Sequence, residues 1–527
     1  MKMKSKTQST RVLIIGGGAT GTGLARDLAL RGIPCILVEK QDINAGASGG
    51  NHGLLHSGAR YVASDTEAAK ECRVESEILK RLAPHCIDDT GGLFVAVAGD
   101  NENYIADFPY YCSTCGISAT PLDIGTAREM EPALSDIIIA AYQVQDASID
   151  PFRLSLENIS HAQHLGCVFL KNTEVTDFHI HEGRIQAAGL RNPLTGETFL
   201  IEAEQVVSAG GAWAQKIGKL AGISIGMIYS KGTLLVTPNR IAGRVINRLR
   251  RATDGDILVP GGTVSILGTT SVRIESPDMV TPTVEEVDLI IDQGAVMVPV
   301  LAHSRYIRAY SGVRPLLQPA SAENDRQVSR GFALIDHQED GLENFITITG
   351  GKLTTFRLMA EKTADLICRR LRVTALCSTK TEPLPETQNG QWTEPGISPR
   401  LWMEKQNPED SLLCECEMVP ASVVEKLHAS ILDEGLTPDI HAIALRSRIG
   451  KGPCQGAFCS VRVAAHLYNL GKLNADEGIR QLKHFLSERW RGQHPLLWNQ
   501  ALAQSELLEA IHCGTFCLEQ SEKEESF

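Results

Sequence analysis

The fold of this chain is decided by one short stretch, Arg11-Val12-Leu13-Ile14-Ile15-Gly16-Gly17-Gly18-Ala19-Thr20-Gly21. An apolar strand runs directly into glycines with GxGxxG spacing, and a helical stretch follows to Gly32. Gly16 allows a tight turn, Gly18 lets the backbone approach a pyrophosphate, and Gly21 allows close packing of the helix. The helix N-terminus offers free N–H groups to phosphate. The stretch therefore predicts an α/β, Rossmann-like dinucleotide-binding unit.

A second apolar run, Cys35-Ile36-Leu37-Val38, ends at Glu39. An acidic residue about 20 positions beyond such glycines can accept hydrogen bonds from both ribose hydroxyls, and it disfavours a 2′-phosphate. The motif alone does not separate NAD from FAD.

The composition is that of a large, acidic, globular chain of 527 residues, which suggests about three domains. Lys and Arg number 51 against 63 Asp and Glu, a formal charge of −12 that argues against a nucleic-acid partner. No apolar run approaches the roughly 18 residues of a spanning helix. Residues 1–6 are basic, but the apolar stretch behind them is the glycine-interrupted strand. We therefore expect no signal peptide and a cytoplasmic chain.

A second glycine turn favours FAD. From about 90 to 340, short strands alternate with turn signals, which predicts a mostly antiparallel sheet inserted into the nucleotide-binding unit. The strand Phe345-Ile346-Thr347-Ile348-Thr349 then runs into Gly350 and Gly351, followed by a helix. NAD domains need no second grip more than 300 residues from the first. Residues 66–83 have helical periodicity, and residues 378–410 read as a linker with little core of its own.

The cysteines suggest a second redox centre. Cys414 and Cys416 are followed, after 37 residues, by Cys454 and Cys459. Four thiolates in two close pairs can hold a [2Fe-2S] cluster, and a helix beginning near Pro453 would favour the thiolate form. Structural zinc is the alternative, although CxC is less usual for zinc than CxxC.

Several motifs together resemble the FAD-dependent glycerol-3-phosphate dehydrogenases, within them the A subunits of the anaerobic enzymes. The resemblance covers residues 11–498 and rests on these runs: Ile14 to Gly21, Asn51-His52-Gly53-Leu54-Leu55-His56-Ser57-Gly58-Ala59-Arg60-Tyr61, Asp150-Pro151-Phe152-Arg153-Leu154, Tyr310-Ser311-Gly312-Val313-Arg314-Pro315-Leu316 and Ile348-Thr349-Gly350-Gly351-Lys352-Leu353. The final cysteine set is similar to a BFD-like [2Fe-2S] module.

The resemblance implies oxidation of sn-glycerol 3-phosphate to dihydroxyacetone phosphate, with hydride passing from C2 to flavin N5. Under this hypothesis Arg60, Tyr61, Arg314 and Lys352 bind the substrate, and His56, Arg314 and Lys352 are catalytic, His56 as the base. The expected FAD-binding residues are Gly16, Gly18, Gly21, Glu39, Ser48, Val175, Gly210, Gly350 and Gly351. The aerobic relatives carry a histidine soon after a Lys-Gly-Ser element, whereas this chain has Lys231-Gly232-Thr233-Leu234. Their base therefore does not transfer.

The predicted architecture is an FAD-binding domain (1–90 and 341–377) with an inserted substrate domain (91–340, returning to the FAD domain near 140–215). The linker (378–410), a [2Fe-2S] domain (411–470) with Cys414, Cys416, Cys454 and Cys459 as ligands, and a C-terminal helical extension (471–527) follow. Electrons would pass singly from FAD to the cluster, then through two partners, a flavoprotein (the B subunit) and an iron–sulfur protein (the C subunit), to quinone. The chain would lie peripherally on the inner face of the cytoplasmic membrane.

Two rival functions remain open. The same flavoprotein scaffold could oxidise a 2-hydroxy acid or a secondary amine. A non-enzyme alternative is a nucleotide-binding sensor that uses a zinc module to engage a partner; it would lack flavin and iron–sulfur colour.

Overall fold

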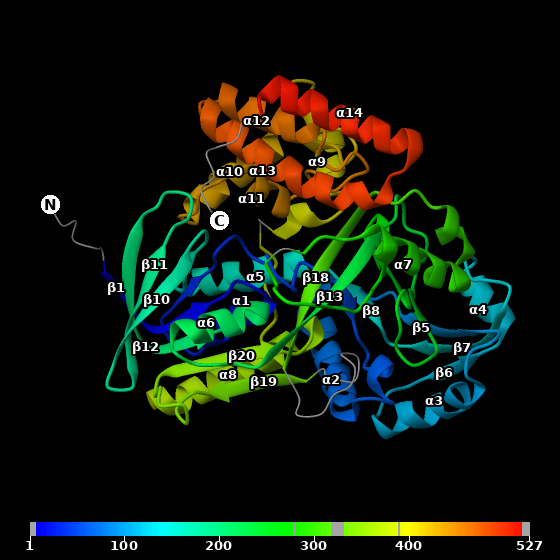
Figure 1. Cartoon of the computed structure of the whole chain (residues 1–527), viewed down its shortest axis with the longest axis horizontal. Helices are drawn as coiled ribbons and strands as arrows, with labels where there is room; N and C mark the ends of the chain where they lie inside the picture. Colours follow the sequence, from blue (N-terminus) through cyan, green and yellow to red (C-terminus); the bar gives the residue numbers. More distant parts are fainter. Residues whose placement is uncertain (1–6, 279, 318–330, 388–389, 519–527) are drawn as a thin grey trace.

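The computed structural model describes residues 7–278, 280–317, 331–387 and 390–518. The basic opening, residues 1–6, on which the expectation of no signal peptide depends, lies outside the described residues. Two large sheets lie side by side, and a bundle of C-terminal helices covers both of them (Figure 1).

The first sheet has eight strands and is built around β1 (Thr7–Ile15). β1 pairs in parallel with β12 (Thr198–Ser208) on one side and with β2 (Cys35–Val38) on the other. The remaining strands are β9 (Val168–Leu170), β10 (Glu174–His181), β11 (Arg184–Arg191), β19 (Phe332–Asp336) and β20 (Phe345–Gly350). β20 pairs in parallel with β12, so the carboxyl ends of β1, β12 and β20 meet at one edge of the sheet.

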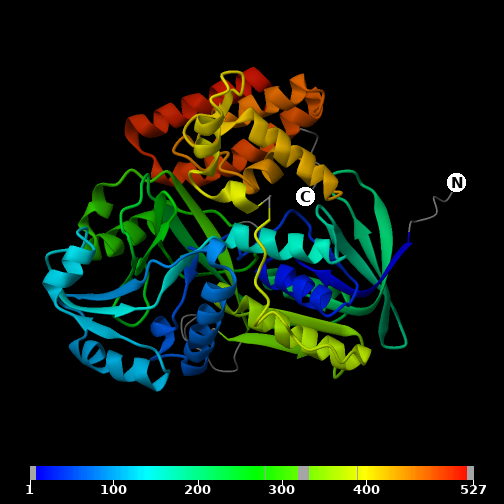
Figure 2. The same ribbon diagram turned by 180° about the vertical axis from the view of Figure 1, so that it is seen from behind.

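Three helices pack together against this sheet. α1 (Ala19–Leu30) contacts both α5 (Pro151–His164) and α8 (Phe356–Leu371), as Figure 2 shows. Gly23 allows the approach of α8, because a Cβ there would lie 2.9 Å from Cδ2 of Phe356. The first predicted glycine helix therefore packs against the helix that follows the second glycine turn.

The second sheet has nine strands, and all its pairings are antiparallel except that of β14 with β5. Its strands are β5 (Gly92–Val97), β6 (Thr120–Leu122), β7 (Ile138–Val144), β13 (Met227–Val236), β14 (Val245–Arg248), β15 (Ile257–Gly261), β16 (Val264–Gly268), β17 (Val272–Ile274) and β18 (Arg308–Leu317). β3 (Leu54–Leu55), β8 (Ala147–Ile149) and β4 (Ile87–Asp88) form a small third sheet.

The helices of this half are α2 (Thr66–Leu82), α3 (Glu102–Thr114), α4 (Ile124–Met130), α6 (Ala214–Leu220) and α7 (Val284–Met297). The helix predicted over 66–83 is confirmed as α2, which Asp65 caps by accepting a hydrogen bond from the Ala68 N–H.

The C-terminal part consists of α9 (Ile397–Lys405), β21 (Leu412–Cys414), β22 (Val419–Pro420), α10 (Ala421–Asp433), α11 (Ile440–Leu445), α12 (Cys459–Asn469), α13 (Ala475–Gln493) and α14 (Asn499–Phe516). The prediction of a helix beginning near Pro453 is wrong, because α12 begins at Cys459. Gln455 and Gly456 have φ angles of 50° and 92°, which a right-handed helix does not accommodate.

A buried charge cluster joins these helices to the first sheet. Asp42, in the loop after β2, accepts hydrogen bonds from Arg446 (Nη1–Oδ2 3.1 Å) and Lys171 (Nζ–Oδ2 3.5 Å), and Lys171 also pairs with Asp439 (3.0 Å). Burial alone would raise the pKa of Asp42, but Arg446 and Lys171 hold it well below its usual range. One apolar cluster also runs from β1 through α10 to α13, and Trp392, in the expected linker, belongs to it. The C-terminal helices therefore share a core with the nucleotide-binding sheet.

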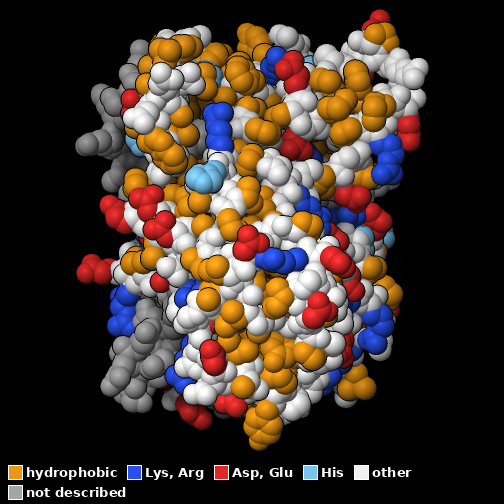
Figure 3. Space-filling view, turned by 90° about the vertical axis from the view of Figure 1, so that its right-hand side faces the viewer, with side chains coloured by type: hydrophobic (Ala, Val, Ile, Leu, Met, Phe, Trp, Pro, Cys, Tyr) orange, Lys and Arg blue, Asp and Glu red, His pale blue; other side chains and the backbone are white. Residues whose placement is uncertain are grey.

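Within the described residues, no helix is both long enough and apolar enough to cross a bilayer. The face at the right of Figure 1 carries acidic, basic and apolar side chains side by side (Figure 3).

Candidate active site

A cavity of about 2060 Å³ opens at the edge where β1, β12 and β20 end. The expected cofactor residues that line it are Gly16, Gly18, Glu39, Ser48, Val175, Gly210, Gly350 and Gly351. The expected substrate and catalytic residues that line it are His56, Arg60, Tyr61, Arg314 and Lys352. Of the predicted site residues, Gly21 and the four cysteines are not among its walls.

The first glycine turn has little room for side chains. Gly16 has a φ of 119°, and a Cβ on it would lie 2.6 Å from the carbonyl oxygen of Ala209, at the end of β12. A Cβ on Gly21 would lie 1.9 Å from the carbonyl oxygen of Gly16. Gly21 therefore sets how closely α1 packs on the turn, as its place in the motif predicts.

Two polar side chains fix the turn. Glu39 accepts hydrogen bonds from the backbone N–H groups of Gly17 (2.7 Å) and Gln41 (2.9 Å). Burial raises the pKa of Glu39. Ser48 Oγ accepts a hydrogen bond from the Ala19 N–H at 3.0 Å, at the first residue of α1. Each carboxylate oxygen of Glu39 keeps a second lone pair, so it can still accept from a ribose hydroxyl.

The second glycine turn reaches the same cavity from β20. Gly350 and Gly351 have φ angles of 80° and 70°, and a Cβ on Gly351 would lie 2.5 Å from Sδ of Met359. Thr349 donates a hydrogen bond to the Gly211 carbonyl at 3.0 Å, which ties the end of β20 to the glycines after β12. Backbone from both halves of the sequence thus surrounds one space.

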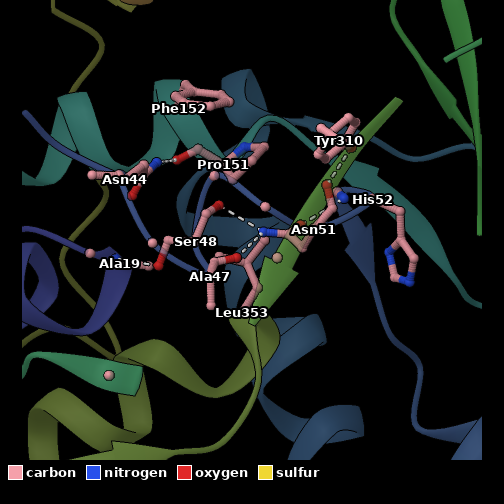
Figure 4. Close-up of a pocket in the computed structure, with 18 of the residues that line it drawn as sticks. Ala19, Asn44, Ala47, Ser48, Asn51, His52, Pro151, Phe152, Tyr310 and Leu353 are labelled. Atoms are coloured by element: carbon pink, nitrogen blue, oxygen red, sulfur yellow. Dashed lines mark hydrogen bonds between the residues drawn. The ribbon is translucent and has the colours of Figure 1, made fainter. Parts of the chain in front are cut away.

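The loop 44–53 forms another wall of the cavity (Figure 4). Asn44 donates to the Pro151 carbonyl (2.6 Å), and Asn51 donates to the Ser48 carbonyl (2.7 Å). The Tyr310 hydroxyl, on β18, donates to the Asn51 carbonyl at 2.8 Å. These bonds hold glycine-rich backbone flat against the cavity.

Cations from three separate parts of the chain meet in this cavity. Arg60 donates to Asp256 (Nη2–Oδ2 3.1 Å), while its Nη1 is buried without a hydrogen-bond partner among the described residues. Arg314 donates to the Thr270 carbonyl (3.1 Å) and to the Thr269 hydroxyl. The Lys352 ammonium lies 4.7 Å from the centroid of the Tyr61 ring.

Two histidines lie beside these cations. His56 is 7 % exposed, and its Nε2 lies 3.4 Å from the Tyr61 hydroxyl. Burial, then the neighbouring His52 ring and Lys352, lower the pKa of His56 well below its ordinary value. Burial and Arg314 lower the pKa of His52 to about 3. Both rings are therefore neutral at pH 7, and a neutral imidazole can accept a proton.

The comparisons with known proteins agree with this geometry. Residues 11–366 match the model of a family described as FAD dependent oxidoreductase. Over 99% of this chain, 43% of residues are identical to the A subunit of the anaerobic glycerol-3-phosphate dehydrogenase of Escherichia coli (strain K12), all of which is covered. This chain belongs to that A-subunit family of FAD-dependent oxidoreductases.

A more distant member of the A-subunit family, the A1 subunit of the Haloferax volcanii enzyme, is 38% identical over 96% of this chain and 91% of its own length. Among solved structures, the glycerol-3-phosphate dehydrogenase from Bacillus halodurans, complexed with FAD, has a TM-score of 0.62 at 22% identity. That match covers 93% of this chain and 97% of the other, and it supports the fold.

The residues at the two turns fit the FAD that the family name implies. Gly16, Gly18, Gly350 and Gly351 present backbone to the cavity, α1 directs its N-terminus towards it, and Glu39 stands at the end of β2. This arrangement can hold a pyrophosphate, a ribose and a flat ring system.

The four cysteines lie together in the C-terminal part. The Sγ atoms of Cys414 and Cys416 are 3.7 Å apart, and those of Cys416 and Cys454 are 3.8 Å apart. Hydrogen bonds from the thiols of Cys416 and Cys459 lower the pKa of the Cys454 thiol. Among the described residues, no group of three or more His, Cys, Asp or Glu side chains is arranged to hold a single metal ion.

Two features of the cavity are not predicted from the sequence. His52 lies in the motif that runs from Asn51 to Tyr61, which by itself gives it no role, although its four-residue separation from His56 could have paired them; their ring centroids are 6.1 Å apart. Asp256, the partner of Arg60, comes from a loop 196 residues away, and no sequence signal marks it.

Proposed function

We propose that this chain oxidises sn-glycerol 3-phosphate to dihydroxyacetone phosphate with FAD as the hydride acceptor. The observation that carries the proposal is the meeting of two glycine turns, three cations and two neutral histidines in one cavity. The relatives named as anaerobic glycerol-3-phosphate dehydrogenases support this choice of substrate.

Each side chain has a part in this proposal. Bound FAD supplies the hydride acceptor. Arg60 and Arg314 bind the phosphate of the substrate, because a guanidinium fork can bond two oxygens at once. Lys352 adds a third positive charge beside Tyr61. His56, kept neutral by burial, accepts the proton of the C2 hydroxyl as the carbonyl forms.

The finer part of the proposal concerns where the electrons go. Cys414, Cys416, Cys454 and Cys459 would hold a [2Fe-2S] cluster, which supplies one-electron transfer when bound. The relatives are named as one subunit of a larger enzyme, which supports two partners, the flavoprotein B and the iron–sulfur protein C, that carry electrons to quinone. The chain would then lie peripherally on the inner face of the cytoplasmic membrane. We retain 411–470 as the cluster-binding domain.

The test of the substrate is an anaerobic titration of the purified protein, with the flavin absorbance followed. Glycerol 3-phosphate should bleach the flavin band, whereas lactate and sarcosine, as a 2-hydroxy acid and a secondary amine, should not. Bleaching by either of these but not by glycerol 3-phosphate would favour the rival oxidase activity.

The test of the cluster is metal analysis of the wild type and of Cys414→Ser, with Cys86→Ser, a buried cysteine elsewhere, as the matched control. We expect iron and acid-labile sulfide in the wild type and in the control, and neither in Cys414→Ser. Stoichiometric zinc without sulfide in the wild type would replace the cluster with a structural zinc site.

A further inference from the structure

The cavity extends past the glycine turns to the C-terminal helices, where Arg308, Lys451 and Arg489 line it. Arg308 is the first residue of β18, Lys451 precedes the cysteine loop, and Arg489 lies on α13. Pockets for one small ligand usually measure about 300–1,000 Å³. The cavity, at about 2060 Å³, therefore has room for a ligand besides FAD and the substrate.

The two arginines lack the partners that interior arginines have elsewhere in the molecule. Within the described ranges, Arg308 and Arg489 form no side-chain hydrogen bond and no ion pair, and the Nε atom of each is fully buried. By contrast, Arg357 bonds both Glu75 and Glu361, at 2.6 to 2.7 Å.

Aromatic faces stand where carboxylates would be expected. The guanidinium carbon of Arg489 lies 4.9 Å from the centroid of the Phe485 ring, and Lys451 Nζ lies 5.7 Å from that of Phe152. Lys451 Nζ also donates to the Leu445 carbonyl at 3.4 Å. These contacts orient the cations without neutralising them.

The charges around this end of the cavity do not cancel. Glu488 is the acidic neighbour of Arg308 and Arg489, so three cations face one carboxylate, a net charge of +2. Arg448 is neutralised by Glu417 (Nε–Oε2 2.8 Å). Burial lowers the pKa of Arg489 to about 9 with Arg308 acting in the same direction, and burial and Arg448 lower that of Lys451 to about 7.

We infer that Arg308, Lys451 and Arg489 form a second anion-binding site, which takes a phosphate dianion. An uncompensated buried charge costs several kcal/mol, so about two unbalanced positive charges favour a dianionic ligand. Guanidinium groups bond phosphate oxygens in pairs. The chemistry is shared by inorganic phosphate and by the end of a phosphate monoester.

The site is separate from the proposed substrate cations. Arg308 and Arg314 lie six residues apart on β18, which is about 20 Å at roughly 3.3 Å per residue. The inference therefore goes beyond the proposed function and does not depend on it.

The test is calorimetric titration of inorganic phosphate into the FAD-loaded protein carrying Arg314→Met, which removes a proposed substrate cation. We expect phosphate still to bind, and Arg489→Met or Arg308→Met added to this background to weaken binding at least tenfold. Arg480→Met is the matched control, because Arg480 is on the same helix and pairs with Glu477. It should leave the dissociation constant unchanged.

Two results would overturn the inference: loss of all phosphate binding in Arg314→Met alone, or dissociation constants within twofold of that background in both Arg489→Met and Arg308→Met. Titration with glycerol 2-phosphate separates the two sources of ligand, since binding of both supports a monoester site and binding of inorganic phosphate alone supports a free-anion site.

Thermal unfolding gives an independent readout. Without phosphate, Arg489→Met should unfold at the same temperature as the wild type or higher, because it removes an uncompensated charge. Saturating phosphate should raise the unfolding temperature of Arg480→Met but raise that of Arg489→Met less. Equal gains in the two variants would contradict a site at Arg489.

Discussion

Replacing Arg60 with methionine should reduce activity while leaving the fold intact. Asp256 accepts five hydrogen bonds: one from Arg60, two from Arg250, and two from the backbone and hydroxyl of Thr253. Four of them survive in Arg60→Met, so Asp256 stays paired. We expect the free energy of unfolding to fall by less than about 1 kcal/mol.

The effect on catalysis should be much larger. A hydrogen bond to a charged group contributes about 1.5–3 kcal/mol. At about 1.4 kcal/mol per factor of ten, the loss of the Arg60–phosphate bond should lower kcat/KM for glycerol 3-phosphate by about 10- to 150-fold. Steady-state kinetics with an artificial electron acceptor measure this ratio, and urea unfolding measures the stability.

The complementary variant Asp256→Asn should show the opposite balance. It leaves the guanidinium groups of Arg60 and Arg250 without their carboxylate in a site where Asp256 is 1 % exposed. Breaking a buried pair in this way costs about 3–5 kcal/mol of stability. Arg251→Met, at an exposed neighbour, should change neither quantity. If Arg60→Met loses less than threefold in kcat/KM, or as much stability as Asp256→Asn, the assignment of Arg60 to the substrate is refuted.

Three further changes test the fold and the site. Gly21→Ala should lower the flavin content of the purified protein, because its Cβ would lie 1.9 Å from a backbone oxygen; Gly514→Ala, in open space on α14, should keep full flavin content. Since burial lowers the pKa of His52 to about 3, the unfolded chain binds a proton below pH 6.5 that the native state does not. Stability is therefore lost as pH falls, by about 2 kcal/mol at pH 5 at about 1.36 kcal/mol per pH unit, and urea unfolding of His52→Gln should lack this slope. Asp42→Asn leaves Arg446 unpaired and should cost about 3–5 kcal/mol in the same assay; a cost below about 1 kcal/mol would contradict it.

The parts of the fold that the sequence predicts are those in which local chemistry decides the structure. Gly16, Gly21, Gly350 and Gly351 lie where only a glycine fits, because backbone or buried atoms occupy the space of a side chain. The motif around Arg60 likewise reaches the cavity as expected, since it follows the glycine loop directly.

Long-range pairing lies beyond such local signals. Arg308, Lys451 and Arg489 are up to 181 positions apart in the sequence, and each by itself reads as an ordinary surface cation. The helix expected near Pro453 fails for a different reason. The left-handed backbone at Gln455 depends on how the cysteine loop packs against α13, which residue types do not report.

The contact of Asp42 with Arg446 also bears on how the molecule comes apart. Asp42 follows Glu39 by three residues, so the loop that borders the ribose position also anchors the C-terminal helices. Heating should then give a single calorimetric endotherm instead of two. A truncated chain that stops at residue 377 should not persist as an isolated flavoprotein, because its outer surface would carry an abandoned acid and a bared patch of α1 and α5.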